Sequence, residues 1–254
     1  MPPAVERYLS DLVEAARSVL GSGLVGAYPA GSLGLSAFQP GRSDIDIALV
    51  CAQPLDLPTK RRLVEALRQE NLPVPARGLE LVVYTLAAAR SGTAEPAFEV
   101  ELNTGPAMDF RATYGGDQRD PADGLFWYGL DRSILRESTG ALLGPPVGAV
   151  FGPIAEDDLR RLLIESLRWW TALPLAEGPA PGAEDAVLGA CRALVRVRSG
   201  RWLAKNAAAR ELIAEWRDVE LLEASIAARS GGPPVTGAAA RAFQGEVLAA
   251  LMAE

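Results

Sequence analysis

Two aspartates stand one residue apart in the stretch SDIDI, residues 43–47, directly before an apolar run that ends at Val50. In an extended strand, side chains two residues apart point to the same face, so Asp44 and Asp46 would present two carboxylates side by side. Two neighbouring charges of the same sign repel each other, and a bound cation would offset that repulsion. Carboxylate oxygens suit Mg²⁺, which usually completes its coordination with substrate phosphates. The pair therefore predicts a magnesium site.

Hydroxyl and glycine residues close to this pair predict a phosphate site. A short strand is expected to run from Leu24 into a Gly31-Ser32 turn, where backbone N–H groups and a hydroxyl can approach a phosphate closely. Ser43, directly before the first aspartate, adds a second hydroxyl. A phosphate site and a metal site so close in sequence predict that the ligand is a nucleoside triphosphate.

A third carboxylate, Glu80, heads the apolar run of residues 79–84. A charged residue at the head of a buried strand is poorly explained as a solvated side chain. If this strand lies beside the one that carries Asp44 and Asp46, then Glu80 could accept a proton from an attacking hydroxyl. Each feature alone has an ordinary alternative, because D-x-D pairs are common in solvated turns, and it is their combination that favours a reactive site.

The composition excludes several other classes of site. The 254 residues contain no histidine, which removes His-based triads, zinc sites and general bases. Cys51 and Cys191 are far apart and predict two reduced core thiols. A net charge of −7 argues against a long nucleic acid as partner and suits a small cationic ligand. No apolar run reaches the roughly 20 residues that a membrane span needs, and the first residues do not read as a secretion signal, so we expect a cytoplasmic monomer.

The hydrophobic pattern predicts two halves of different fold class. The first is expected to be an α/β domain with a mixed sheet, and the second an all-α helical bundle, since no strand stands out after about residue 150. The boundary is expected near Gly152-Pro153, which gives domains 1–152 and 153–254. Expected strands lie within 24–32, 44–50 and 98–105, and another lies within 79–89, where a helix start or a loop is expected to follow it. Expected helices cover 5–20, 58–70, 125–139, 155–173, 183–200, 206–218, 219–231 and 235–254.

The stretch GSLGLSAFQPGRSDIDIALV, residues 31–50, resembles the signature of the DNA polymerase β-like nucleotidyltransferase superfamily. Over nearly its full length the chain resembles the streptomycin/spectinomycin adenylyltransferases, which are aminoglycoside-resistance enzymes with a helical C-terminal domain. The stretches that carry this narrower resemblance are RGLELVVY, LLGPPVGAVFGPIAEDDLRRLLIESLRWW, DAVLGACRALVRVRSGRW and KNAAARELIAE.

The resemblance implies a reaction and a role for each matching residue. The reaction would be transfer of AMP from the co-substrate ATP to a hydroxyl of an antibiotic, with Mg²⁺ as cofactor. Residues 1–152 would form the nucleotidyltransferase domain, and residues 153–254 a helical domain that clamps substrate and nucleotide. The implied site comprises Glu80 as general base, Asp44 and Asp46 as metal ligands, and Gly31, Ser32, Ser43, Arg192 and Lys205 as contacts to the triphosphate.

The acceptor pocket departs from the pattern of the streptomycin-modifying members. Ala107 stands where a tryptophan is expected, and the segment LPLAEGPAPGAEDAV has no tryptophan, which favours a spectinomycin-like aminocyclitol. Candidate contacts to a cationic acceptor are Glu101, Asp109, Trp170 and Asp185, although acids in loops and at helix starts are more often solvated or capping residues. Another small molecule, a protein or an RNA end are the alternative acceptors.

Overall fold

The computed structural model describes residues 1–138, 140–216 and 219–253. It divides the chain into two compact units, Met1–Ala155 and Glu156–Glu254. The sequence placed this division between residues 152 and 153. The ends of three expected helices, at residues 139, 217–218 and 254, lie outside the described residues.

The first unit is built on a five-stranded mixed sheet, which confirms the predicted fold class. The strands follow one another in the sheet in the order of the sequence. Only β2 and β3 run parallel, and the other three neighbouring pairs are antiparallel. The strands are β1 Leu24–Pro29, β2 Ile45–Cys51, β3 Leu79–Thr85, β4 Phe98–Gly105 and β5 Met108–Thr113.

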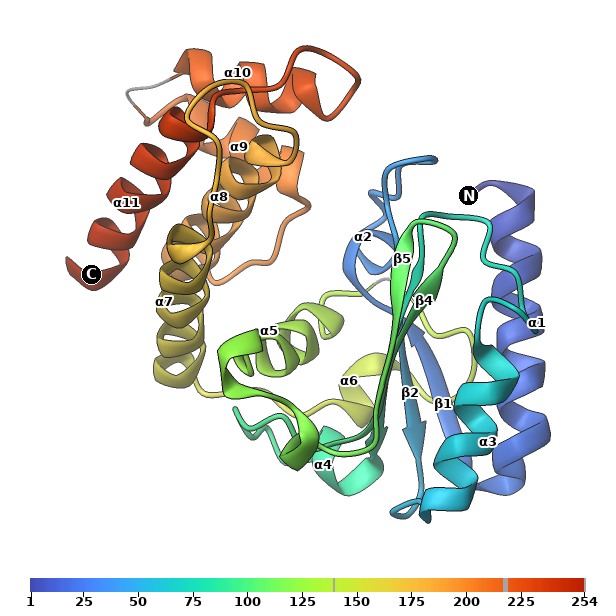
Figure 1. Ribbon diagram of the computed structural model, residues 1–254. Helices are drawn as coiled ribbons and strands as arrows, with labels where there is room; N and C mark the ends of the chain where they lie inside the picture. The colour runs from blue at the N-terminus through green and yellow to red at the C-terminus, as the bar shows by residue number, and fades with distance from the viewer. Residues whose placement is uncertain (139, 217–218, 254) are drawn as a thin grey trace. The chain divides into compact units, whose positions relative to one another are not determined.

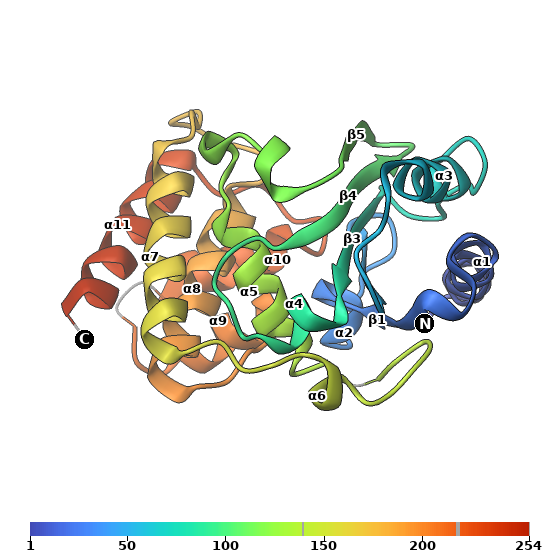
Figure 2. The same cartoon turned by 90° about the horizontal axis from the view of Figure 1, so that it is seen from below.

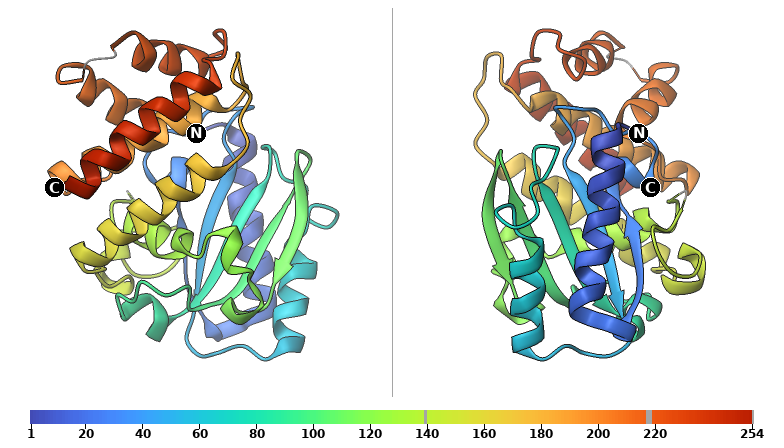
Figure 3. Two further views of the ribbon diagram at one scale, coloured as in Figure 1. Left: turned by 60° about the vertical axis from the view of Figure 1, so that its left-hand side comes forward. Right: turned by 90° about the vertical axis from the view of Figure 1, so that its right-hand side faces the viewer.

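Helices cover both faces of this sheet (Figures 1 and 2). On one face, α1 (Pro3–Leu20) and α3 (Leu57–Leu67) pack on the side chains of Ile45, Ile47 and Leu49, and Figure 3 (right) shows both helices in front of the sheet. The opposite face carries α4 (Leu86–Arg90), α5 (Phe126–Leu135) and α6 (Val147–Val150) over a second apolar core. The short helices α2 (Gly31–Gly34), η1 (Gly21–Gly23), η2 (Gly116–Gln118) and η3 (Pro121–Asp123) complete the unit.

Successive side chains of β2 point to opposite faces of the sheet and so contribute to two different apolar cores. Ala48 and Val50 belong to the core under α5, whereas their neighbours Ile47 and Leu49 belong to the core under α1. Because side chains two residues apart share a face, Asp46 lies on the same face as Ala48, at the beginning of the strand. The second aspartate therefore faces the side of α5.

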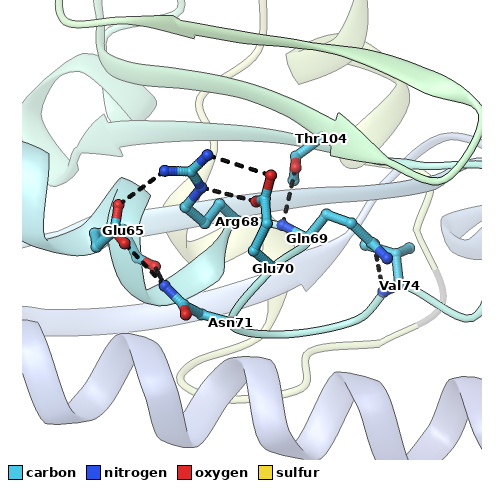
Figure 4. Close-up of polar contacts among 7 residues, drawn as sticks. All are labelled: Glu65, Arg68, Gln69, Glu70, Asn71, Val74 and Thr104. Atoms are coloured by element: carbon cyan, nitrogen blue, oxygen red, sulfur yellow. Dashed lines mark hydrogen bonds and ion pairs between the residues drawn. The ribbon is translucent and has the colours of Figure 1, made fainter.

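The loop that leads from α3 into β3 is fixed by side-chain hydrogen bonds (Figure 4). Arg68 bonds Glu65 and Glu70, but all three are at the surface, where such pairs stabilise a fold only weakly. The backbone N–H of Gln69 donates to Thr104 Oγ1 at 2.9 Å, and Thr104 is buried in β4. This part-buried bond ties the loop to the sheet ten residues before β3 begins.

A buried arginine on α5 holds the loop between α4 and β4. Arg132 is 2% exposed and donates to the carbonyl oxygens of Thr93, Glu95 and Pro96 at 2.6, 2.6 and 3.0 Å. Its guanidinium also lies 5.1 Å from the centre of the Tyr84 ring. Burial lowers the pKa of Arg132, and the three carbonyl groups compensate for the water that the charge has lost.

The second unit is helical throughout its five described elements, as predicted. They are α7 Glu156–Ala172, α8 Ala183–Ser199, α9 Lys205–Ile213, α10 Val219–Ala228 and α11 Gly237–Ala253. The most buried of them, α8, packs against α9, α10 and α11, and α7 packs against α11. No helix in the described ranges is both long and apolar enough to cross a membrane.

We predict that Arg132→Met destabilises the protein by about 1–3 kcal/mol, because three carbonyl groups in part-buried hydrogen bonds lose their charged donor. Urea unfolding followed by circular dichroism measures this change. The control is Arg17→Met, which removes an exposed arginine of α1 that bonds Glu14 at 3.5 Å and should change stability by less than about 0.5 kcal/mol. Equal effects of the two substitutions would contradict the role assigned to Arg132.

Candidate active site

The parallel strands β2 and β3 bring two of the predicted acids together. In the register of this pair Asp46 stands opposite Glu80, and both strands begin at this edge of the sheet. Asp44 directly precedes Ile45, the first residue of β2. The backbone therefore gathers Asp44, Asp46 and Glu80, which are far apart in sequence, at one end of the sheet.

Burial and neighbouring charges act together on Asp46. Its pKa lies well above the usual value, first because the carboxylate is removed from water, and then because Glu80, Asp131 and Asp44 repel its negative charge. The backbone N–H of Ser32 donates to the carboxylate and opposes the shift. A carboxylate in this setting gains from any nearby positive charge.

The pKa of Glu80 is raised as well. The largest cause is the loss of hydration of the carboxylate within the protein, and the next is repulsion by the negative charge of Asp44. Arg111 and a hydrogen bond with Asp46 partly offset this rise. Two carboxyl groups can share a hydrogen bond only when one holds a proton, so Asp46 and Glu80 compete for a proton or a cation.

Gly31 and Ser32, which the sequence predicted as a turn, are the first two residues of the short helix α2, and they lie directly against Asp46. Gly31 has φ +49°, and a Cβ atom at this position would collide with the Asp46 carboxylate. The backbone N–H of Ala30 donates to the Asp46 carbonyl oxygen at 2.8 Å, which joins the turn to β2. The hydroxyl oxygen of Ser32 is buried and has no hydrogen-bond partner within the described residues. A buried hydroxyl without a partner beside a carboxylate is a feature that a polar ligand would satisfy.

Ser43 forms hydrogen bonds within the loop that precedes β2. Its hydroxyl accepts a hydrogen bond from the backbone N–H of Gln39 at 3.0 Å, and its backbone N–H donates to the Gln39 carbonyl oxygen at 2.8 Å. The residue is 6% exposed. Ser43 therefore shapes the segment that leads to Asp44, and its predicted contact with a triphosphate stays a prediction.

The predicted cations of the second unit, Arg192 and Lys205, lie close to each other. The charge of Arg192 lowers the pKa of Lys205, although burial is the larger cause, and Arg192 lies 5.7 Å from the centre of the Trp202 ring. Lys205 donates to Asp185 Oδ1 at 2.9 Å, and Arg229 bonds the same oxygen. The predicted acceptor contact Asp185 is thus the counter-ion of two cations.

The other predicted acceptor contacts lie in dissimilar surroundings. Glu101 is buried in β4, where its carboxylate accepts hydrogen bonds from Arg111 at 2.9 Å and from Thr113 at 3.2 Å. Asp109 is exposed on β5, and Trp170 is partly exposed on α7. None of these settings establishes a contact with an acceptor, so the assignments stay predictions.

The sequence interpretation missed two charged residues that belong to these groups. Asp131 of α5 acts on Asp46, and Arg229, just after α10, bonds Asp185. Neither residue stands in a motif, and each reaches its group only because its helix packs in a particular place. A helical period marks the faces of α5 and α10, but it does not say which strand or helix each face meets.

The donor set fits Mg²⁺ that arrives with a nucleotide. Within the described residues, no three or more Asp, Glu, His or Cys side chains are grouped so that they alone could hold a metal ion. Mg²⁺ commonly binds one or two protein carboxylates and takes its other ligands from water and phosphate oxygens. Asp44 and Asp46 can supply such a pair, and the unsatisfied Ser32 hydroxyl lies beside it.

We predict that Asp46→Asn raises the melting temperature at neutral pH in buffer that contains a metal chelator. The raised pKa values of Asp46 and Glu80 mean that wild-type stability falls as pH rises above about 4, where these groups ionise in the unfolded chain. Removing one charge relieves this loss, and each kcal/mol gained shifts the midpoint by about 2–4 °C.

Mg²⁺ provides the second arm of that measurement. It should stabilise the wild type and have little effect on Asp46→Asn. The control is Asp11→Asn on the exposed side of α1, which should behave as the wild type does. A variant that melts below the wild type in the chelator would contradict the repulsion inferred for this site.

Comparison with known proteins shows the fold of the whole chain. No protein-family model and no curated protein sequence matches it. Among solved structures, it is similar to the spectinomycin adenyltransferase AAD(9) from Enterococcus faecialis, determined with ATP and spectinomycin. The TM-score is 0.71 at 14% sequence identity, and the match covers 98% of this chain and 99% of that one. The chain therefore has the fold of this adenyltransferase, as the resemblance predicted.

Proposed function

We propose that the protein is a magnesium-dependent nucleotidyltransferase that transfers AMP from ATP to a hydroxyl of a small cationic acceptor. One observation carries the proposal: β2 and β3 place Asp46 opposite Glu80, beside the Gly31-Ser32 turn and its unsatisfied hydroxyl. The fold it shares with an adenyltransferase that was solved with ATP supports the same reaction.

Glu80 is the proposed general base. The hydroxyl oxygen of the acceptor forms a bond to the α-phosphorus of ATP, the bond from that phosphorus to pyrophosphate breaks, and the hydroxyl proton passes to the Glu80 carboxylate. A raised pKa suits this role because it makes the carboxylate a stronger proton acceptor. Solvent reaches Glu80 in β3, which leaves a path for an acceptor.

The remaining residues bind and orient the nucleotide. Asp44 and Asp46 would hold Mg²⁺, which when bound neutralises charge on the phosphates and assists the departure of pyrophosphate. Ser32 would donate its free hydroxyl to a phosphate oxygen. From the second unit, Arg192 and Lys205 would contribute positive charge to the triphosphate.

The acceptor that we propose is an aminocyclitol of the spectinomycin type. The net charge of −7 and the carboxylates of the first unit favour a cationic molecule over a polyanion. Ala107 stands where the streptomycin-modifying enzymes are expected to carry a tryptophan. The structurally similar enzyme was solved with spectinomycin, which supports this choice of acceptor.

Incubation of the protein with Mg²⁺, isotope-labelled ATP and a panel of aminoglycosides and aminocyclitols tests the proposal. We expect mass spectrometry to find spectinomycin or a related aminocyclitol increased by one AMP, and streptomycin unmodified. The transfer should stop when a chelator removes Mg²⁺. Label found on protein or RNA, with every panel member unmodified, would reject the small-molecule acceptor, and no transfer to any acceptor would reject the enzyme itself.

We predict that Glu80→Gln lowers kcat by about 10²- to 10⁴-fold, the usual contribution of a general base. MgATP should still bind, because the amide preserves the shape of the side chain. Turnover and equilibrium nucleotide binding are the two measurements, and Glu70→Gln in the exposed loop after α3 is the matched control. Unchanged turnover in Glu80→Gln would remove this residue from the role of base.

A further inference from the structure

Four polar residues stand side by side across four strands of the sheet in the first unit. Asp46 of β2 is opposite Glu80 of β3. Glu80 is in turn opposite Asn103 of β4, and Asn103 is opposite Arg111 of β5. Residues opposite each other on neighbouring strands point to the same face of a sheet. Arg111 therefore lies on the face of the sheet that carries the candidate base, at the far end of this row.

Two residues of β4 hold the guanidinium of Arg111. Its Nη2 atom donates to Glu101 Oε1 at 2.9 Å. The same atom donates to the amide oxygen of Asn103 at 3.1 Å when this amide is oriented so that both of its polar atoms have partners. Among the residues that the structure describes, none accepts a hydrogen bond from Nε or Nη1 of Arg111, and 43% of its side chain is exposed. Because a guanidinium has several N–H groups, Arg111 keeps donors for a ligand.

Glu101 does not depend on Arg111 for a counter-ion. Arg119 Nε lies 3.7 Å from Glu101 Oε2, and only 7% of the Arg119 side chain is exposed. The Thr113 hydroxyl donates to the same oxygen at 3.2 Å. These two groups supply the positive charge and the hydrogen bond that a buried carboxylate needs. Arg111 is the more exposed of the two arginines, so it is the one that can bind a ligand while Glu101 orients it.

Glu80 lies between Arg111 and the candidate metal ligands. Neighbouring strands are about 4.8 Å apart, so β5 lies about 10 Å from β3 and about 14 Å from β2. In the proposed reaction, Mg²⁺ and the triphosphate are held on the β2 side of Glu80, so the acceptor that brings its hydroxyl to Glu80 extends toward β4 and β5. The charge of Arg111 reaches this base, since it lowers the pKa of Glu80 against the stronger causes that raise it. Solvent reaches Glu80, Asn103 and Arg111, whereas Glu101 in the next row is buried.

We propose that Arg111 binds an uncharged oxygen of the acceptor, a hydroxyl, ether or carbonyl oxygen, and that Glu101 and Asn103 are the positioning residues that orient it. This inference rests on the proposed function, because it places the acceptor of that reaction. A guanidinium donates to oxygen and repels ammonium groups, so the oxygen-rich part of a cationic acceptor lies at β5 and its ammonium groups lie away from Arg111. Glu101 thereby acts through Arg111 and does not itself contact the acceptor, as the sequence had predicted.

The test compares Arg111→Met with the wild type and with Arg62→Met, which removes an exposed arginine of α3 that bonds Thr59 on the same helix. The measurements on the full chain are the KM for ATP, the KM for spectinomycin or the panel member that accepts AMP, and the Kd for the same acceptor by calorimetry. We expect Arg111→Met to raise the KM and Kd for the acceptor about 10-fold, as the loss of a charge-assisted hydrogen bond would. The KM for ATP should not change, and Arg62→Met should match the wild type.

Further variants test the positioning role. Glu101→Gln and Asn103→Ala should each raise the acceptor KM in the wild-type background. Neither should raise it further in the Arg111→Met chain, because both residues act through Arg111. Additive effects would overturn the positioning role. Arg111→Gln retains a donor for Glu101 but removes the charge, so it should also raise the acceptor KM and keeps the test decisive if Arg111→Met does not fold.

The outcomes separate this inference from the proposed function. Spectinomycin binding that depends on Arg111, without any transfer of AMP, would support the acceptor contact and reject the adenylyl transfer. Active enzyme whose acceptor KM is the same in the wild type, Arg111→Met and Arg111→Gln would overturn the inference alone. A rise in the KM for ATP alone would place Arg111 at a phosphate oxygen and overturn it as well. A wild-type chain that neither binds nor modifies any panel member would overturn both.

Discussion

The repulsion between carboxylates at the start of β2 and β3 is the constraint on which the candidate site depends. Asp46 and Glu80 stand opposite each other in a parallel pair, and the pKa of each carboxyl group is raised by loss of contact with water and by neighbouring negative charges. Such an arrangement costs folding free energy, which the two apolar cores of the sheet must offset. Functional sites often lower the stability of a fold, and two neighbouring carboxylates that await a cation are an example.

Local pattern was sufficient to predict the elements that carry the candidate residues Asp44, Asp46 and Ser32, because the signals are short. The alternation in residues 44–50 and the Gly31-Ser32 turn identified β2 and its preceding loop. The pairing of Asp46 with Glu80 needed the topology of the sheet, which a period of two does not contain. The edge strand β5 was missed, because most of its side chains are exposed and it has no apolar run.

Long-range packing determined what the sequence could not show. Asp131 acts on Asp46 because α5 covers that face of the sheet, and Arg229 meets Asp185 because α10 packs on α8. The four predicted acceptor contacts illustrate the same limit. An acid such as Glu101 reads as an available carboxylate in sequence, although Arg111 and Thr113 already occupy it in the fold.

The contact between Gly31 and the Asp46 carboxylate also bears on how this protein could change over generations. A single added methyl group at Gly31 would push directly on a candidate metal ligand, and the positive φ at this residue favours glycine. The residue at position 31 and the Asp46 carboxylate therefore constrain each other, because a larger side chain at position 31 would displace the carboxylate. Substitutions are better tolerated where they leave Gly31 and Asp46 undisturbed, as at the exposed side chains of β5.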